Sequence, residues 1–460
     1  MTPGSFAFET LLDAAASEVF DWHARPGAFE RLVPPWQRVR VLKRSGGICD
    51  GDRVDLLVGS GLLWTRWQLE HREYEAGRQF CDVQVRGPFA HWVHRHEFVP
   101  VEAGRCLLRD EIHYGLPGGA VGAALGERAI RRTLQRVFRY RHRTTADDLR
   151  LHAAHRTRPR LTVALSGARG LIGTALDALL TTGGHRTLRL VRRPAGDLAE
   201  VQWDPERGVL EPARLAGVDA VIHLAGESIA GRWTARRMEA IRHSRVDATQ
   251  ALCASLRALP ERPRVFLCAS AVGLYGDRGA EVLDEDSAPG QGFLPEVCQA
   301  WEAAARAMGP DGVRCVHLRF GVVLTPGGGM LRQLLPAFRL GLGGPVGGGA
   351  QYLSWVSLDD AVGAVYHALF DDRVHGPVNV VAPRPVTSRE FARTLGRVLR
   401  RPAALRVPGC VLRLALGRLA DEVVLASARV APAVLTRTDY CFRHPELDAA
   451  LRHLLGHEVG

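Results

Sequence analysis

Leu161-Thr-Val-Ala-Leu-Ser-Gly-Ala-Arg-Gly-Leu-Ile-Gly173 is the stretch that decides the fold. Its first residues are mostly apolar and predict a short buried strand. Three glycines follow at the spacing GxxGxxG, and helical periodicity then runs over residues 174–180. A strand, a glycine turn and a helix in this order predict a dinucleotide-binding unit, with an ordinary βα turn as the alternative.

Each glycine of this turn has an expected task. Gly167 permits the tight turn, Gly170 lets the backbone approach a pyrophosphate, and Gly173 lets helix and strand pack closely. The phosphates would then accept hydrogen bonds from free N–H groups at the helix N-terminus. The predicted cofactor contacts of the turn are Gly167, Ala168, Arg169, Gly170, Leu171, Ile172 and Gly173.

The end of the second predicted strand, residues 187–191, indicates which dinucleotide is bound. Arg192 and Arg193 follow it, where an NAD-binding protein carries an acidic residue for the ribose 2′-hydroxyl. A carboxylate would repel a 2′-phosphate, whereas arginine can bind it with two hydrogen bonds. The pair therefore favours NADP over NAD, the alternative being two exposed arginines in an arginine-rich protein.

Further motifs follow at the ends of predicted strands. Residues 220–224 form a strand that ends in small residues, which allow a cofactor to approach the sheet edge. A single helix is expected over residues 235–259 and another strand over 264–270. The motifs are His223-Leu-Ala-Gly-Glu227, Ser270-Ala-Val-Gly-Leu-Tyr-Gly276, Trp301-Glu302, Leu318-Arg-Phe-Gly321 and Ser354-Trp-Val-Ser-Leu-Asp-Asp360.

Together with GxxGxxG, these motifs resemble the extended short-chain dehydrogenases/reductases, and within them the YfcH-like "epimerase family protein" branch. The resemblance covers roughly residues 160–455. It implies an α/β Rossmann fold, a doubly wound parallel sheet, with a small C-terminal substrate lobe. It also implies an NADP site in which further residues approach the cofactor: Leu224, Ala225, Gly226, Glu227, Arg245, Ser270 and Val323.

The resemblance fails at the catalytic pair of this superfamily, which is a Tyr and a Lys with three residues between them. Leu294 and Cys298 align with those positions, and the only lysine, Lys43, lies far upstream. A tyrosine needs a nearby cation to act as a base at neutral pH. The remaining candidates for acid–base chemistry are Glu227, Tyr275, Glu302 and Ser270.

The first 150 residues have a different pattern, with a strand, short helical segments, a run of strands and a long final helix over about residues 121–148. This order resembles the START-like (SRPBCC) α+β helix-grip fold, which implies an apolar cavity. The aromatic residues could line that cavity or fill a core. His94 and His96 share one face of a strand, but no third ligand stands at diagnostic spacing, so no metal site is assigned.

Composition narrows the remaining classes. The net charge of +11 comes almost entirely from arginine spread along the chain, and the arginine cluster at 128–143 is interpreted as a solvated helix face. We therefore predict no nucleic-acid partner. No apolar run reaches the length of a membrane span, no signal peptide is apparent, and nine unpatterned cysteines favour a cytoplasmic location.

The sequence predicts four segments and leaves two functions open. The segments are a START-like domain (1–150), a linker (151–160), an NADP-binding Rossmann domain with its substrate lobe (161–405) and a small helical domain (406–460). One interpretation is an NADP(H)-binding epimerase- or oxidoreductase-like enzyme with a non-standard acid–base set and a small-molecule substrate. The other is a non-catalytic NADP(H) sensor that couples the nucleotide to an apolar ligand.

Overall fold

The computed structural model describes residues 4–61, 63–102, 104–309 and 312–457. The chain divides into two compact units. The first comprises the residues up to Thr157 together with short segments at Thr181–Gly184 and from His453 onward; the second comprises Arg158–Leu180 and His185–Arg452.

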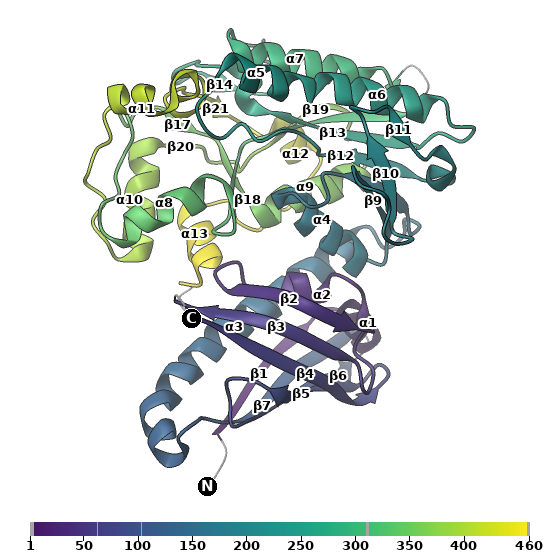
Figure 1. The fold of residues 1–460 in the computed structure, drawn as a ribbon, viewed down its shortest axis with the longest axis vertical. Coiled ribbons are helices and arrows are strands. Elements are labelled where there is room, and N and C mark those ends of the chain that lie inside the picture. The colour runs from purple at the N-terminus through teal and green to yellow at the C-terminus, as the bar shows by residue number, and fades with distance from the viewer. Residues whose placement is uncertain (1–3, 62, 103, 310–311, 458–460) are drawn as a thin grey trace. The chain divides into compact units, whose positions relative to one another are not determined.

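The first unit is an antiparallel sheet packed against one long helix (Figure 1). Its strands run in the order β1-β7-β6-β5-β4-β3-β2, so the first and last strands of the chain segment are neighbours. The helix α3 (Gly119–Ala154) and the short helices α1 (Ala16–Ala24) and α2 (Ala28–Leu32) accompany the sheet. The strands are β1 (Gly4–Leu12), β2 (Arg38–Ser45), β3 (Arg53–Ser60), β4 (Leu63–Glu75), β5 (Gln79–Arg86), β6 (His91–Glu102) and β7 (Arg105–Gly115).

Alternating side chains of this sheet form its core. On β7 every second residue is buried, as expected for a sheet with one face packed on a helix. Trp92 on β6, Ile112 on β7 and Phe138 on α3 belong to one buried cluster. Trp67 and Phe89 contact Trp92 at ring-centroid distances of 5.1 and 4.7 Å, so these aromatic residues pack against one another.

The second unit is built on a mainly parallel sheet with helices on both faces (Figure 1). The strand order is β11-β10-β9-β8-β12-β13-β15-β19. From β8 the chain first adds strands on one side of the sheet, up to β11, and then on the other side from β12 onward, as in a doubly wound dinucleotide-binding fold. The strands are β8 (Thr162–Ser166), β9 (Arg186–Val191), β10 (Glu200–Asp204), β11 (Val209–Leu210), β12 (Ala220–His223), β13 (Val265–Ala271), β15 (Arg314–Phe320) and β19 (Gly376–Val380).

Helices α5, α6 and α7 lie along one face of this sheet, and α4 and α9 along the other (Figure 1). The central strands do not alternate between buried and exposed residues, because helices cover both faces of the sheet. Strand β8, for example, is buried from its second residue onward. The helices are α4 (Leu171–Thr182), η1 (Pro212–Leu215), α5 (Ala235–His243), α6 (Val246–Arg257), η2 (Val272–Tyr275), α7 (Phe293–Arg306) and α9 (Leu358–Phe370).

Short strand pairs and helices form the remaining lobe. β14 (Val282–Leu283) pairs with β21 (Arg429–Val430), so the segment after β13 is tied to the C-terminal part of the chain. The other elements are β16 (Val322–Leu324), β17 (Tyr352–Leu353), β18 (Trp355–Ser357), β20 (Val386–Thr387), α8 (Gly329–Arg339), α10 (Ser388–Leu399), α11 (Gly409–Leu416), η4 (Ala420–Val424), α12 (Ala433–Arg437) and α13 (Leu447–Leu455).

The structure differs from the sequence-based expectations in three places. The expected helix over 235–259 is broken into α5 and α6 at Ser244 and Arg245, where the Arg245 N–H bonds to the carbonyl of Arg242, three residues back, instead of the one four residues back. Helix α3 ends at Ala154 rather than near Asp148, since Leu149 still packs on the core of the first unit. Strand β10 was not expected, its apolar pattern being only five residues long. Among the described residues, none of the helices is both long and apolar enough to cross a membrane.

Candidate functional site

The glycine turn after β8 is held against the end of β12. Gly167 has a φ of +69°, and a Cβ there would lie 2.8 Å from the carbonyl group of Leu224. At Gly173 a Cβ would lie 2.1 Å from the Gly167 carbonyl oxygen. Both positions therefore need glycine, the first for its left-handed backbone and close approach, the second for packing of α4 on the turn. The N-terminus of α4 is thereby aimed across the carboxyl edge of the sheet.

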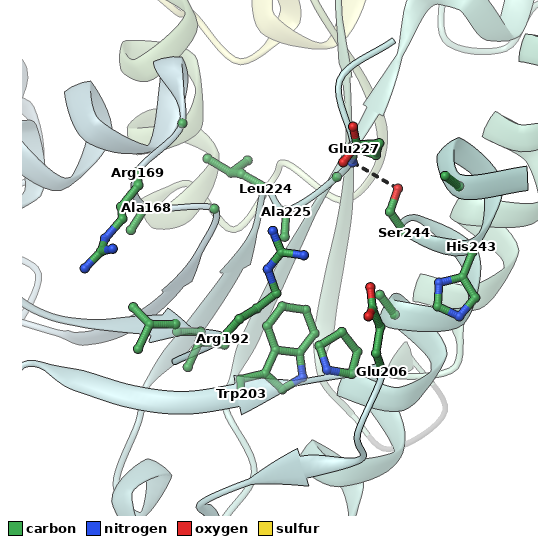
Figure 2. Close-up of a pocket in the computed structure, with 18 of the residues that line it drawn as sticks. Ala168, Arg169, Arg192, Trp203, Glu206, Leu224, Ala225, Glu227, His243 and Ser244 are labelled. Carbon is green, nitrogen blue, oxygen red and sulfur yellow. Dashed lines mark hydrogen bonds between the residues drawn. The ribbon is translucent and has the colours of Figure 1, made fainter. Parts of the chain in front are cut away.

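A cavity of about 810 Å³ opens at this edge, between the glycine turn and the ends of β9, β10 and β12 (Figure 2). This is where open α/β sheets bind their ligands, because the strand order reverses there. Ten of the residues predicted to contact the cofactor line the cavity: Gly167, Ala168, Arg169, Gly170, Arg192, Arg193, Leu224, Ala225, Gly226 and Glu227. The lining does not include the other predicted residues, which are Leu171, Ile172, Gly173, Arg245, Ser270 and Val323.

Four arginines line the cavity, and three of them, from the glycine turn and the end of β9, differ in their partners. Arg193 donates to Glu200 at 2.7 Å, and Arg169 donates to the same carboxylate oxygen at 3.2 Å. Glu200 is buried, and hydrogen bonding to the Gly196 N–H together with these arginines lowers its pKa. Arg192 has no acidic partner among the described residues, and Figure 2 shows its side chain projecting into the cavity. Of the three arginines at the glycine turn and the end of β9, Arg192 is therefore the one available to an anionic ligand; Arg236 lies on the opposite wall, on α5.

A buried polar chain braces the floor of the site. Ser166 at the end of β8 accepts from the backbone N–H groups of Leu224 and Ala225 at 3.1 and 3.2 Å. Its hydroxyl lies 2.6 Å from Nδ1 of His223, whose Nε2 lies 3.0 Å from the Thr249 hydroxyl. Burial lowers the pKa of His223 to about 4, so the ring is neutral near pH 7. This chain fixes the backbone that lines the cavity.

The break between α5 and α6 contacts the loop after β12. The Glu227 N–H donates to the Ser244 hydroxyl at 2.9 Å, as Figure 2 shows, and Arg245 donates to the Glu227 carbonyl at 3.0 Å. The Arg245 guanidinium also lies 5.2 Å from the Trp301 ring centre. Ser244 lines the cavity, whereas Arg245 is not in the lining and contacts the loop through the Glu227 carbonyl. The Glu227 carboxylate is partly exposed, 3.4 Å from Arg237.

Three of the four candidate acid–base residues belong to a buried network instead of the cavity lining. The Ser270 hydroxyl donates to Glu302 at 2.8 Å, and Arg319 donates to both Glu302 oxygens. Arg319 also donates to the Tyr275 hydroxyl at 2.9 Å, which in turn donates to Asn379 at 2.8 Å. Each of these polar groups has its partner within the protein, which is how buried polar groups avoid a desolvation penalty.

The positions aligned with the superfamily's Tyr and Lys carry no acid–base group suited to neutral pH. Leu294 packs in an apolar cluster that also contains Trp233 and Phe293. Cys298 is buried, and burial raises the pKa of its thiol to about 12. Lys43 lies on β2, in the first unit. Of the four candidates, Glu227 alone lines the cavity.

Part of the lining was not predicted. Strand β10 brings Trp203, Pro205 and Glu206 to the cavity, where Figure 2 shows Trp203 beside Arg192. The only sequence signal was the short alternation around Val201 and Trp203. The helix pair α5–α6 adds a second wall, made of Arg236, Glu239, Ala240, His243, Ser244 and Ala248.

Comparison with known proteins assigns the second unit. Residues 163–381 match the model of the NAD dependent epimerase/dehydratase family. An epimerase family protein of Mycobacterium bovis is 42% identical over 290 residues, which cover 63% of this chain and 96% of that protein. This chain belongs to the epimerase family. The human relative, epimerase family protein SDR39U1, is 37% identical over 64% of this chain and 99% of its own length.

Solved structures and two further family models extend the comparison. The crystal structure of a nucleoside-diphosphate sugar epimerase from Corynebacterium glutamicum has a TM-score of 0.81 at 32% identity, covering 98% of this chain and 90% of that one. Human SDR39U1 (isoform 2), solved with NADPH, has a TM-score of 0.60 at 36% identity, covering 64% of this chain and 99% of that one. Residues 12–138 match the family described as polyketide cyclase/dehydrase and lipid transport, and residues 407–454 match a domain of unknown function.

Proposed function

We propose that this chain binds NADP(H) in the cavity at the carboxyl edge of its parallel sheet. We also propose that it acts as an epimerase- or oxidoreductase-like enzyme of the YfcH-like branch with a non-standard acid–base set. The observation that carries the NADP(H) assignment is Arg192, a cation without an acidic partner among the described residues, at the end of β9. The NADPH in the human relative supports the same assignment.

The cavity fits such a group on several counts. Gly167 and Gly173 leave no room for a Cβ, so the turn offers bare backbone to a pyrophosphate. Helix α4 adds N–H groups and the positive end of its dipole. Arg192 would bind the 2′-phosphate, while Trp203 and Pro205 provide an apolar wall near it. When bound, the nicotinamide would supply hydride transfer.

Glu227 is the proposed proton carrier. It lines the cavity on a loop that Ser244 and Arg245 hold by hydrogen bonds to its backbone, so its side chain remains available. Its carboxylate lies 3.4 Å from Arg237 and is a group that can accept a proton from a substrate hydroxyl. Tyr275, Glu302 and Ser270 would then act as positioning residues, because their polar atoms are engaged with one another and with Arg319.

Calorimetry on the full chain tests the cofactor assignment. Arg192→Ala should weaken NADPH binding by about 1.5–3 kcal/mol, ten- to a hundredfold or more, and leave NADH binding unchanged. Arg193→Ala is the matched control: that arginine is occupied by Glu200, which keeps Arg169 as a partner, so a smaller loss is expected. Equal affinities of the unmodified protein for NADPH and NADH would refute the proposal.

A second candidate is a non-catalytic NADP(H) sensor whose first unit takes an apolar ligand. The missing Tyr–Lys pair and the family description of residues 12–138 support it. Steady-state oxidation of NADPH by a panel of carbonyl compounds separates the two. If the protein is an enzyme, we expect turnover, and Glu227→Gln should lower its rate at least tenfold while NADPH affinity is retained. Glu239 is another acidic residue of the lining, and Glu239→Gln should change the rate little. The absence of turnover with all compounds would favour the sensor.

A further inference from the structure

The first unit carries a buried group of histidines and aspartates on the helix-facing side of its sheet. Asp82 on β5 stands directly opposite His94 on β6, and on its other side opposite His71 on β4. His96, two residues beyond His94, therefore points to the same face, where it stands opposite Asp110 on β7. The pairing of four strands thus places two rows of ionisable side chains next to each other: His71, Asp82 and His94 in one, and His96 and Asp110 in the other.

The distances between these side chains suit a metal ion. The Asp82 Oδ2 atom lies 3.6 Å from Nδ1 of His94 and 3.4 Å from Nε2 of His96. Two ligands on one tetrahedral zinc ion, with bonds of about 2.0–2.1 Å, are separated by about 3.3–3.4 Å. One ligand atom from each of the three residues lies within 4.8 Å of the others. An ion could therefore be bound with small side-chain adjustments.

Asp110 lies close to both histidines, on the side of their rings opposite Asp82. Its Oδ1 atom lies 2.7 Å from Nε2 of His94 and 2.6 Å from Nδ1 of His96, which are the ring nitrogens turned away from Asp82. Its Oδ2 atom lies 2.5 Å from Nε2 of His142 on α3, whose other nitrogen lies 2.9 Å from the Thr10 hydroxyl. A carboxylate on the outer nitrogen of a histidine fixes the ring and its tautomer for metal binding. Here one carboxylate is hydrogen-bonded to the His94 ring and lies within ion-pair distance of the His96 ring.

The two histidines are tightly packed, while Asp82 is partly exposed. His94 and His96 are 2% and 5% exposed, whereas the Asp82 side chain is 20% exposed and offers a way in. The Phe80 ring stacks on His96 with centroids 4.3 Å apart, and Phe138 meets His94 edge-on at 5.2 Å. The two imidazoles are thus locked in place by packing, which is the preorganisation that a metal site needs.

We propose that Asp82, His94 and His96 bind a divalent transition-metal ion, with Asp110 as the residue that positions both histidines. Two imidazoles and a carboxylate suit Zn²⁺ and its neighbours among the transition metals more than Mg²⁺ or Ca²⁺. Three protein ligands leave at least one coordination position for water or a small ligand. The proposal is independent of the nucleotide site, which lies in the second unit.

Cobalt and zinc titrations of the chelator-treated full chain test the proposal directly. We expect one equivalent of Co²⁺ to bind with the visible absorption of a tetrahedral site, and Zn²⁺ to displace it and raise the melting temperature. Less than a tenth of an equivalent of either ion would overturn the proposal and leave a hydrogen-bonded His–Asp cluster. A thiolate-to-cobalt absorption band would also overturn it, because it would place the ion on an exposed cysteine such as Cys49.

Variants locate the ion. His96→Gln should remove the stoichiometric binding, and Asp110→Asn should weaken it about 10–100-fold. His113→Gln is the control, since His113 is on β7 but 45% exposed and paired with Glu111. Retained binding in a folded His96→Gln protein would refute the assignment. If the buried variants fail to fold, as judged by circular dichroism, the titrations of the unmodified chain still decide the question.

Discussion

Arg319 and Glu302 form a buried ion pair in which two guanidinium nitrogens meet two carboxylate oxygens. Nε of Arg319 lies 2.8 Å from Oε1 and Nη2 lies 3.0 Å from Oε2, and both residues are less than a tenth exposed. The pair joins β15 to α7 beside the end of β13. Glu302, which the sequence suggests as an acid–base residue, therefore stabilises the edge of the sheet through this ion pair.

Glu302→Gln should destabilise the protein. The amide keeps the shape of the carboxylate but leaves the Arg319 charge buried without its counter-charge, a loss of about 3–5 kcal/mol. Urea unfolding at neutral pH, followed by circular dichroism, measures it. Glu296→Gln on the exposed side of the same helix is the control and should change stability by about 0.5 kcal/mol or less. A Glu302→Gln protein as stable as the control would disprove the role of the pair.

The same ion pair predicts a pH dependence. Burial by itself would raise the pKa of Glu302, but the hydrogen bonds and charge of Arg319, with the Ser270 hydroxyl, bring it below the ordinary value of 4.5. A carboxyl group with a lowered folded-state pKa stabilises the protein above its unfolded-state pKa, and this contribution is lost as the pH falls through the folded-state value. The stability difference between the unmodified protein and Glu302→Gln should be constant near neutrality and shrink below pH 4.5. A difference that stays constant throughout would contradict the lowered pKa.

Tyr275→Phe should affect stability more than chemistry. Burial raises the pKa of Tyr275 to about 12, despite the opposing effect of Arg319, so the phenol cannot be a base near pH 7. Loss of the hydroxyl leaves Arg319 with Glu302 but removes the hydrogen bond that Nη1 makes to the phenol, and it leaves the buried Asn379 Oδ1 without its donor, which costs about 1–3 kcal/mol. Any NADPH turnover should stay above a tenth of the original rate. A thousandfold loss in a folded variant with normal NADPH affinity would make Tyr275 a catalytic residue.

Gly173→Ala should weaken NADPH binding by displacing α4, although residue 173 does not line the cavity. The new methyl group would meet the Gly167 carbonyl oxygen at 2.1 Å, so α4 must move away from the turn. Overpacking of this kind costs about 1–3 kcal/mol. We expect NADPH affinity to fall at least tenfold in calorimetry. Gly348→Ala, where a Cβ would find open space, should leave affinity and melting temperature unchanged.

Residues 158–460 should fold and bind NADPH without the first unit. The mycobacterial and human relatives are matched over nearly their whole length by about 63–64% of this chain, so a protein with only this part exists in other organisms. The shortened protein should be soluble, melt cooperatively and bind NADPH within about threefold of the full chain, a difference of less than 1 kcal/mol. An insoluble or nucleotide-blind product would mean that the first unit completes the core of the second.

The glycine turn and the strands next to it could be predicted because their signals are local. A strand, three glycines and a helix follow one another along the chain, and a Cβ at Gly167 or Gly173 would collide with neighbouring backbone. The same holds for Arg192 at the end of β9. Strand β10 and the break between α5 and α6 could not be predicted, because the first is too short to show a period and the second is stabilised by contacts of Ser244 and Arg245 with a distant loop.

The sequence by itself determined the Rossmann unit, its cofactor edge and the absence of the Tyr–Lys pair. Only the tertiary structure decided which polar residues face the cavity. Glu227 and Glu302 are alike as sequence candidates, yet one lines the cavity and the other is held by Arg319. In the same way, Asp82 joins His94 and His96 through strand pairing across β5 and β6. The physical reason is that burial and pairing depend on residues far apart in the chain, whereas turns and periodicity are properties of neighbours.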